Sequence, residues 1–198
     1  DAATGTQVPP AAADAATAPA AGTDAAAGTP AQGGPVPLAG LTVIDLSWVG
    51  AGPYVSRPFA VMGADVIKVE TVTRPDPIRL MRPARDGVVG INRSGYYANR
   101  NPDKRSVTIN LKTAEGVEAV KRLIASADVL VTNFRPGVMD RLGLGRPVLR
   151  TLNPRLIYLE MPMQGNTGPQ AEYIGYGLTL MALGGLYELS GAAGQDPI

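Results

Sequence analysis

Short apolar runs that alternate with helical segments constrain this chain more than any other feature. Residues 41–46 (LTVIDL) and 65–70 (DVIKVE) are apolar runs of strand length, and residues 54–63 between them have a helical pattern. A glycine-rich loop, SWVGAGPY, joins the first run to the helical segment. Strand, loop, helix and strand in this order predict a parallel βαβ unit.

The same pattern recurs later in the chain. Residues 105–111 are typical of a strand, Thr113 of a helix N-cap, and residues 114–126 of a helix with one apolar stripe. Two further strands are predicted at residues 128–132 and 156–160. The sequence therefore predicts the α/β class, with an open, mainly parallel, Rossmann-like sheet and flanking helices.

In such sheets, ligands bind beyond the carboxyl ends of the strands. The stretch NFRPG lies at one of these ends, directly after the strand at residues 128–132. Asn133 offers a donor and an acceptor, Phe134 a flat apolar face and Arg135 a cation, which suits an aromatic, phosphorylated ligand. Alternatively, Pro136 begins a helix and Asn133 closes a turn, and the residues alone leave both interpretations open.

The glycines after the first strand invite a comparison with the dinucleotide-binding fingerprint. That fingerprint requires G-x-G-x-x-G and an acidic residue at the end of the second strand. Glu70 supplies the acidic residue, but Val55 or Ser56 occupies the third glycine position and Pro53 directly follows the glycine pair. The fingerprint is incomplete, so nicotinamide binding is not expected.

Composition divides the chain into two parts. Residues 1–36 are rich in Ala and Pro and contain no Lys, Arg or aromatic residue, which predicts a disordered linker or tail. The chain begins at Asp1 without the basic start and apolar core of a secretory signal, so a connection to an upstream segment is expected. No run approaches the roughly 20 apolar residues of a membrane span. The absence of Cys excludes disulfides and favours the cytoplasm.

Charge is uneven within residues 37–198. Ten basic residues face four acidic ones between Lys68 and Lys112, which favours an anionic partner. The basic residues are spread among prolines and glycines instead of along a helix face, and no nucleic-acid motif is present, so nucleic acid is not expected. Ordinary solvated loop charge is the alternative.

Six blocks follow one another in the sequence: PLAGLTVIDLSWVGAGPY, GADVIKVE, NRNPDKRSVTINLKTAEG, ADVLVTNFRPGVMDRLGLG, LNPRLIYLEMPMQGNTGP and GYGLTLMALGGLYELSG. They resemble successive blocks of the class III CoA-transferases. The resemblance runs in order from about Pro37 to the last residue. The family includes formyl-CoA transferase, the carnitine CoA-transferase and α-methylacyl-CoA racemase. The block EMPMQGNTGP followed by GYG is most similar to the benzylsuccinate CoA-transferase branch.

The resemblance implies that residues 37–198 are the N-terminal portion of a CoA-transferase domain, incomplete at its C-terminus. Such an enzyme moves CoA from an acyl-CoA to a carboxylic acid through an aspartyl anhydride and an enzyme–CoA thioester. The nucleophilic Asp belongs to a Gly-Asp block beyond Ile198, so no catalytic residue is expected in this chain, and Asp196 and Glu160 do not match its position. Coenzyme A is a substrate; no tightly bound cofactor and no metal are expected.

The resemblance also implies which residues contact CoA. It assigns a backbone contact loop after the first strand, a region for the adenine and phosphates, and a tyrosine that faces the thioester. Thr71 stands where relatives often have an arginine, so the resemblance implies either that Arg74 takes its place or that phosphate binding is weaker. The implied contact residues are Val49, Gly50, Ala51, Arg74, Lys104, Arg105, Ile109, Lys112, Asn133, Phe134, Arg135, Arg141 and Tyr176.

The sequence leaves two other functions open. Racemase activity resembles a His and Asp relay; the chain has no His, and Gly177 replaces an acidic residue of many relatives, so this function is disfavoured. A non-catalytic CoA-binding half that supports another subunit or a fused domain is the main alternative. Family members form interlocked dimers, so the resemblance implies a homodimer or heterodimer for the full-length protein.

Overall fold

The computed structural model describes residues 36–190 and residue 194. The linker predicted for residues 1–36 lies outside this part of the chain, except for Val36. In chain order the elements are β1 (Thr42–Asp45), α1 (Ala51–Val61), β2 (Asp65–Glu70), η1 (Pro77–Leu80), η2 (Arg85–Gly87), α2 (Gly95–Arg100), β3 (Arg105–Thr108), α3 (Ala114–Ala125), β4 (Val129–Thr132), α4 (Val138–Arg141), α5 (Arg146–Leu152), β5 (Ile157–Glu160) and α6 (Gly177–Leu183).

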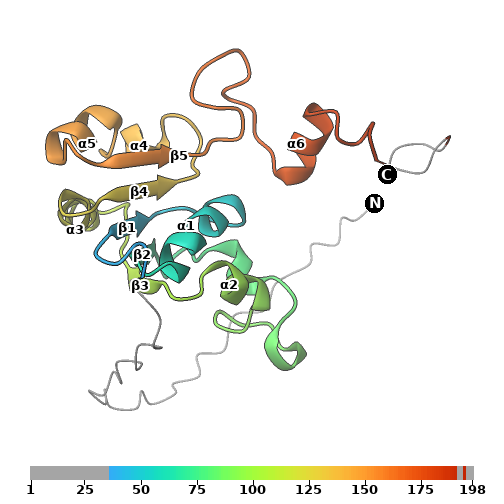
Figure 1. The fold of residues 1–198 in the computed structure, drawn as a ribbon, viewed down its shortest axis with the longest axis horizontal. Helices are drawn as coiled ribbons and strands as arrows, with labels where there is room; N and C mark the ends of the chain where they lie inside the picture. Colours follow the sequence, from blue (N-terminus) through green and yellow to red (C-terminus); the bar gives the residue numbers. More distant parts are fainter. Residues whose placement is uncertain (1–35, 191–193, 195–198) are drawn as a thin grey trace, which may run out of the picture. The chain divides into compact units, whose positions relative to one another are not determined.

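The five strands form one parallel sheet in the order β3-β2-β1-β4-β5. The chain runs outward from β1 to β3, then crosses back to β4 on the other side of β1. Figure 1 shows the arrowheads of β4 and β5 at one edge of the sheet. The predicted α/β fold is therefore confirmed, and the strand order reverses between β1 and β4, where such sheets place their ligand crevice.

Alternating side chains bury both faces of the sheet. Ile44 and Leu130 pack with Val120 and Ile124 of α3 in one core, whereas Val43 packs with residues of α1 and β4 in the other. Successive residues of a strand point to opposite faces, so each central strand contributes to both cores. Burying an aliphatic side chain of this size stabilises the fold by about 1.5–3 kcal/mol. Because a shifted register would expose these side chains, their burial fixes the strand register and the edge of the sheet at which the loops emerge.

The boundaries of two predicted elements differ from the structure. Helix α1 begins at Ala51, earlier than predicted, because Pro53 is tolerated in a first helical turn, where the backbone N–H has no intrahelical partner. Strand β3 ends at Thr108, and after one more bond, from the Ile109 N–H to the Glu70 carbonyl (2.7 Å), the chain turns away.

Several short helices were not predicted from the sequence, namely η1, η2, α2, α5 and α6. The helix after NFRPG begins at Val138 and not at Pro136, because Gly137 precedes it with a left-handed φ of 73°. Within the described residues, no helix combines the length and apolar character that crossing a bilayer requires.

Candidate functional site

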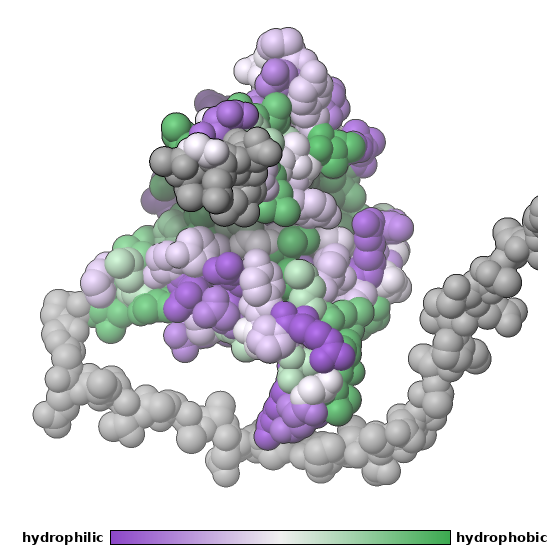
Figure 2. Space-filling model, turned by 90° about the vertical axis from the view of Figure 1, so that its right-hand side faces the viewer, coloured by the Kyte–Doolittle hydropathy of each residue, from purple (hydrophilic) through white to green (hydrophobic). Residues whose placement is uncertain are grey.

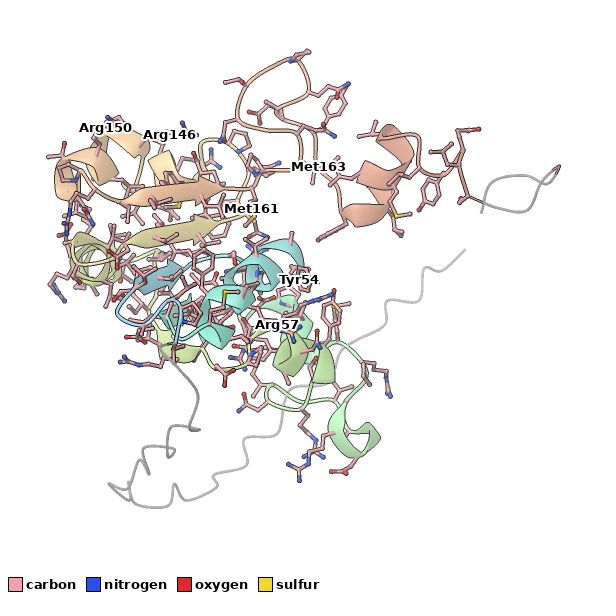
Figure 3. All side chains as sticks on the ribbon, viewed as in Figure 1. Tyr54, Arg57, Arg146, Arg150, Met161 and Met163 are labelled. Carbon is pink, nitrogen blue, oxygen red and sulfur yellow. The ribbon has the colours of Figure 1, made fainter. Side chains whose placement is uncertain are left out.

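A cavity of about 1150 Å³ opens at the carboxyl edge of the sheet. The segments that follow all five strands contribute to its wall, together with residues of 173–180. Figure 2 views the molecule from this side, where apolar side chains reach the surface among polar ones. In Figure 3, Tyr54 on α1 and Met161 and Met163 after β5 lie toward this edge, whereas Arg146 and Arg150 lie on α5. The cavity occupies the place that the fold predicts for a ligand.

The loop after β1 is held in an unusual conformation. Val49 has a φ of 63°, a left-handed value that is rare for a β-branched residue. Its N–H donates to both carboxylate oxygens of Asp76, at 3.0 and 3.1 Å. The next residue, Gly50, is the N-cap of α1 and has no side-chain cap. Asp76 thus offsets the strain at Val49, and the start of α1, which has no side-chain cap, lines the cavity through Gly50 and Ala51.

Asn133 joins the two strands at which the order reverses. Its Oδ1 accepts from the Trp48 N–H at 2.8 Å, and its Nδ2 donates to the Trp48 carbonyl at 2.6 Å. Both ends of the amide are therefore occupied by the backbone that follows β1. Asn133 lines the cavity but shapes it by fixing Trp48, which corrects the expectation that it closes a local turn.

Trp48 and Phe134 form an aromatic wall in the cavity. Their rings meet edge to face with centroids 6.3 Å apart, and the Arg74 guanidinium lies 5.2 Å from the Trp48 ring centroid. Exposed cations at Lys112 and Arg135 line the same cavity. An aromatic wall beside several cations can hold a flat ring system that carries phosphates.

The carboxylate of Glu70, at the end of β2, already has hydrogen-bond partners within the protein. Arg79 donates to its two oxygens from Nε (2.9 Å) and Nη2 (2.6 Å), and the Tyr97 hydroxyl donates at 2.7 Å. Burial raises the pKa of Glu70, but the hydrogen bonds from Arg79 and Tyr97, together with the charges of Lys68 and Arg79, hold the pKa below its ordinary value. A carboxylate paired in this way is not available to a ribose diol, which agrees with the incomplete dinucleotide fingerprint.

Lys104 lies beneath the cavity wall and not in it. Its Nζ is within hydrogen-bond distance of four oxygens: Asp45 Oδ2 (3.0 Å), the Pro53 carbonyl (2.9 Å), Ser56 Oγ (2.7 Å) and Asn101 Oδ1 (3.0 Å). Its side chain is 1% exposed, and burial lowers its pKa despite attraction to Asp45. The sequence-based expectation that Lys104 contacts phosphate is therefore not supported, because its donors are already used.

Arg105 and Arg141 also lie outside the cavity wall among the described residues. Arg105 is the first residue of β3 and pairs with Asp65, the first residue of β2, at 2.7 Å. Since strands begin at the amino edge of a parallel sheet, this pair lies away from the cavity. Arg141 is exposed at the end of α4. The remaining expected residues all line the cavity: Val49, Gly50, Ala51, Arg74, Ile109, Lys112, Asn133, Phe134, Arg135 and Tyr176. Their role in binding stays a prediction.

The structure adds cavity residues that the sequence analysis did not select. Trp48 is the single tryptophan and follows the predicted strand at residues 41–46 after one serine, so the sequence did contain a signal for it. Tyr54, Tyr96 and Arg100 come from α1 and α2, and no sequence pattern indicated that these residues lie close together.

A smaller hollow of about 250 Å³ lies beside α5, where Arg146 Nε donates to Glu160 Oε2 at 2.6 Å.

Comparison with known proteins gives a consistent picture. The family model described as CoA-transferase family III matches residues 38–198. The succinate–glutarate CoA-transferase of Agrobacterium fabrum is 40% identical over 164 residues, which are 82% of this chain and 41% of that protein. The β subunit of the succinyl-CoA–L-malate CoA-transferase of Chloroflexus aurantiacus is 40% identical over 163 residues, 82% of this chain and 39% of that protein.

Solved structures agree with the sequence comparisons. A CAIB/BAIF family protein from Brucella suis superposes with a TM-score of 0.75 at 39% identity, over 82% of this chain and 43% of that protein. The chain thus spans about two fifths of the length of the proteins that it matches.

Proposed function

Since the chain belongs to CoA-transferase family III, we propose that the complete protein moves CoA from an acyl-CoA donor to a carboxylic acid acceptor. The observation that carries this proposal is the cavity at the carboxyl edge, where an aromatic wall adjoins several cations. Relatives named for succinate, glutarate and malate support short carboxylic acids as the substrate class.

We propose that CoA binds at one end of the cavity. Its adenine would lie against Phe134 and Trp48, because aromatic side chains stack on nucleobases for about 1–3 kcal/mol per base. Its phosphates would be neutralised by Arg74, Lys112 and Arg135, which line the same cavity. CoA would be a substrate in this arrangement and not a resident cofactor.

The reacting end would lie near Tyr176, Met161 and Met163. We place the nucleophilic aspartate outside the described residues, as the resemblance to the family implies. That aspartate would attack the thioester carbonyl, release the CoA thiolate and form a mixed anhydride. The thiolate would then displace the donor acid to give an enzyme–CoA thioester, from which the acceptor carboxylate takes the CoA through a second anhydride.

A non-catalytic CoA-binding half is the second candidate, favoured by a relative that is named as a β subunit. In that case, the full-length protein would supply the cavity to a separate catalytic subunit. For both candidates we propose a dimer, as a homodimer or a heterodimer respectively, and a cytoplasmic location.

An exchange assay on the complete protein tests the proposal. With succinyl-CoA and isotopically labelled carboxylic acids, we expect label to appear in the CoA thioester fraction only when the protein, the donor and an acceptor are all present. Parallel reactions lacking one of the three serve as controls. If no acid in a series of labelled short mono- and dicarboxylic acids passes its label to the CoA thioester fraction while the protein still binds CoA, the transferase proposal fails and the supporting-half alternative gains.

A further inference from the structure

Arg100 is held between two tyrosine rings at the cavity wall. Its Cζ lies 4.6 Å from the ring centroid of Tyr54 and 4.9 Å from that of Tyr96. Within residues 36–190 and residue 194, it forms no ion pair, and its buried Nε has no hydrogen-bond partner. Its Nη2 makes one long bond of 3.4 Å, to the Tyr96 hydroxyl. Buried polar groups are normally paired, so this guanidinium requires an explanation.

A second arginine, Arg79, has the carboxylate partner that Arg100 lacks among the described residues. Arg79 also lies over a tyrosine ring, with its Cζ 3.7 Å from the centroid of Tyr97, but it holds the carboxylate of Glu70 with a two-pronged contact. Arg100 has the aromatic support without the carboxylate. Because a guanidinium matches a carboxylate in planar, two-pronged geometry, the arrangement at Arg100 is complementary to a carboxylate from a ligand.

Arg100 lies toward one end of the cavity. Phe134 and Ile109 pack against the core under α3, whereas Met161 packs against the core on the α1 face of the sheet. Tyr54 is part of α1, and α2, which carries Arg100, contacts α1. The subsite therefore shares the α1 face with Met161, away from the face on which Phe134 packs.

The subsite also adjoins the strained loop after β1. A Cβ placed on Gly50 would lie 3.5 Å from the Tyr96 hydroxyl, so this loop and the arginine subsite share one corner of the cavity. An acyl group whose thioester lies near this loop would extend toward Arg100.

We propose that Arg100, clamped by Tyr54 and Tyr96, binds the free carboxylate of a dicarboxylic acyl group and thereby selects dicarboxylic over monocarboxylic acyl-CoA. This inference rests on the proposed CoA-transferase function. It assigns the specificity to one charge in the cavity, separate from the Phe134 end that would hold the nucleotide. The alternative anion at this position is a phosphate of CoA itself, and the test below separates the two sources.

The test compares two donors that differ only at the far end of a four-carbon acyl group, succinyl-CoA and butyryl-CoA. In the complete protein, Arg100→Met is expected to lower kcat/KM for succinyl-CoA by about tenfold or more, since a hydrogen-bonded charge is lost. The value for butyryl-CoA should change by less than about twofold. Arg100→Lys, which keeps the charge but loses the planar fork, should fall in between for succinyl-CoA.

Arg57→Met is the matched control. Arg57 lies on α1 near Tyr54 but is not among the residues that line the cavity, so both kcat/KM values should remain unchanged. Thermal melting of each variant identifies general unfolding. Equal losses for both donors in a folded Arg100→Met protein, or no loss for either, would overturn the proposal.

Calorimetry with CoA, succinyl-CoA and butyryl-CoA adds a readout that does not depend on turnover. Arg100→Met should leave the affinity for CoA unchanged and remove the preference for succinyl-CoA over butyryl-CoA. An equal loss of affinity for CoA, succinyl-CoA and butyryl-CoA would assign Arg100 to a phosphate, which all three ligands share, and overturn the proposal. If the exchange assay shows no transfer to any acid, the proposed function fails, and the ratio of the two acyl-CoA affinities still decides the role of Arg100.

Discussion

Lys104→Met is expected to lower the free energy of unfolding by about 3–5 kcal/mol, the range for removing one partner of a buried ion pair. The side chains of Lys104 and Asp45 are 1% and 0% exposed. Asp45 also accepts from Ser56 at 2.6 Å and from the Ser47 backbone at 2.9 Å. Methionine matches the length of the lysine stem but removes the ammonium group that contacts the Asp45 carboxylate, so the buried charge loses part of its compensation and keeps Lys68 as a neighbouring cation.

The neighbouring residue provides the control for this prediction. Arg105 pairs with Asp65 at 2.7 Å, but its side chain is 72% exposed. Arg105→Met should therefore change the free energy of unfolding by less than about 1 kcal/mol. Urea titration of the wild-type protein and both variants measures the difference. Small and similar changes for Lys104→Met and Arg105→Met would contradict the buried cluster described here.

The same cluster predicts a change in acid stability. Burial raises the pKa of Asp45, but Lys68 and Lys104 together with hydrogen bonds from Ser47 and Ser56 bring it below its ordinary value of 3.8. A carboxylate of lowered pKa stabilises the fold above its ordinary pKa and loses this contribution as the pH falls through the lowered value. Without Lys104 the folded-state pKa rises, so melting temperatures measured across acidic pH should begin to fall at a higher pH in the variant.

Phe134→Ala is expected to weaken CoA binding by roughly 1–3 kcal/mol, the range for losing an aromatic platform beneath a base. Phe134 is half-buried, packs against the core under α3 and meets Trp48 edge to face. Because the ring is only partly in the core, its loss of stability should stay below the ~3–5 kcal/mol typical of a fully buried phenylalanine. Calorimetry with CoA and chemical unfolding, both on the complete protein, give the two values.

The only other phenylalanine in this chain serves as the control for that experiment. Phe59 on α1 is half-buried against the opposite core and does not line the cavity. Phe59→Ala should therefore lower stability while leaving the affinity for CoA unchanged. An unchanged CoA affinity in Phe134→Ala, beside a large loss of stability, would make NFRPG a structural element and remove the aromatic support for a CoA site.

The sheet and its ligand edge were predictable because their determinants are local. Apolar runs of strand length and the Thr113 cap identify the elements, and the Thr113 hydroxyl does accept from the Gly116 N–H at 3.1 Å. The carboxyl-edge rule then places the loops after β1 and β4 at one cavity. Helix α1 was placed too late because Pro53 and its glycine neighbours are typical of loops, although a first helical turn also accepts them.

The assignment of individual charges was not predictable. Lys104 and Lys112 are both lysines near β3, yet one is buried against Asp45 and the other is exposed at the cavity. Whether each lysine is buried or exposed depends on which distant segment of the chain packs over it, and the local sequence does not contain that information. The aromatic clamp of Arg100 was missed for the same reason, because Tyr54 and Tyr96 meet only through the packing of α1 and α2.

The central claim is that CoA occupies the cavity at the carboxyl edge of the sheet, and amide hydrogen exchange of the complete protein with and without saturating CoA tests it most directly. We expect slower exchange in residues 47–52, 109–112 and 133–137, which supply the cavity wall after β1, β3 and β4. Residues 146–156 beside the smaller hollow should exchange at the same rate in both states. Protection confined to residues 146–156, or no protection of the three loops at saturation, would contradict the claim.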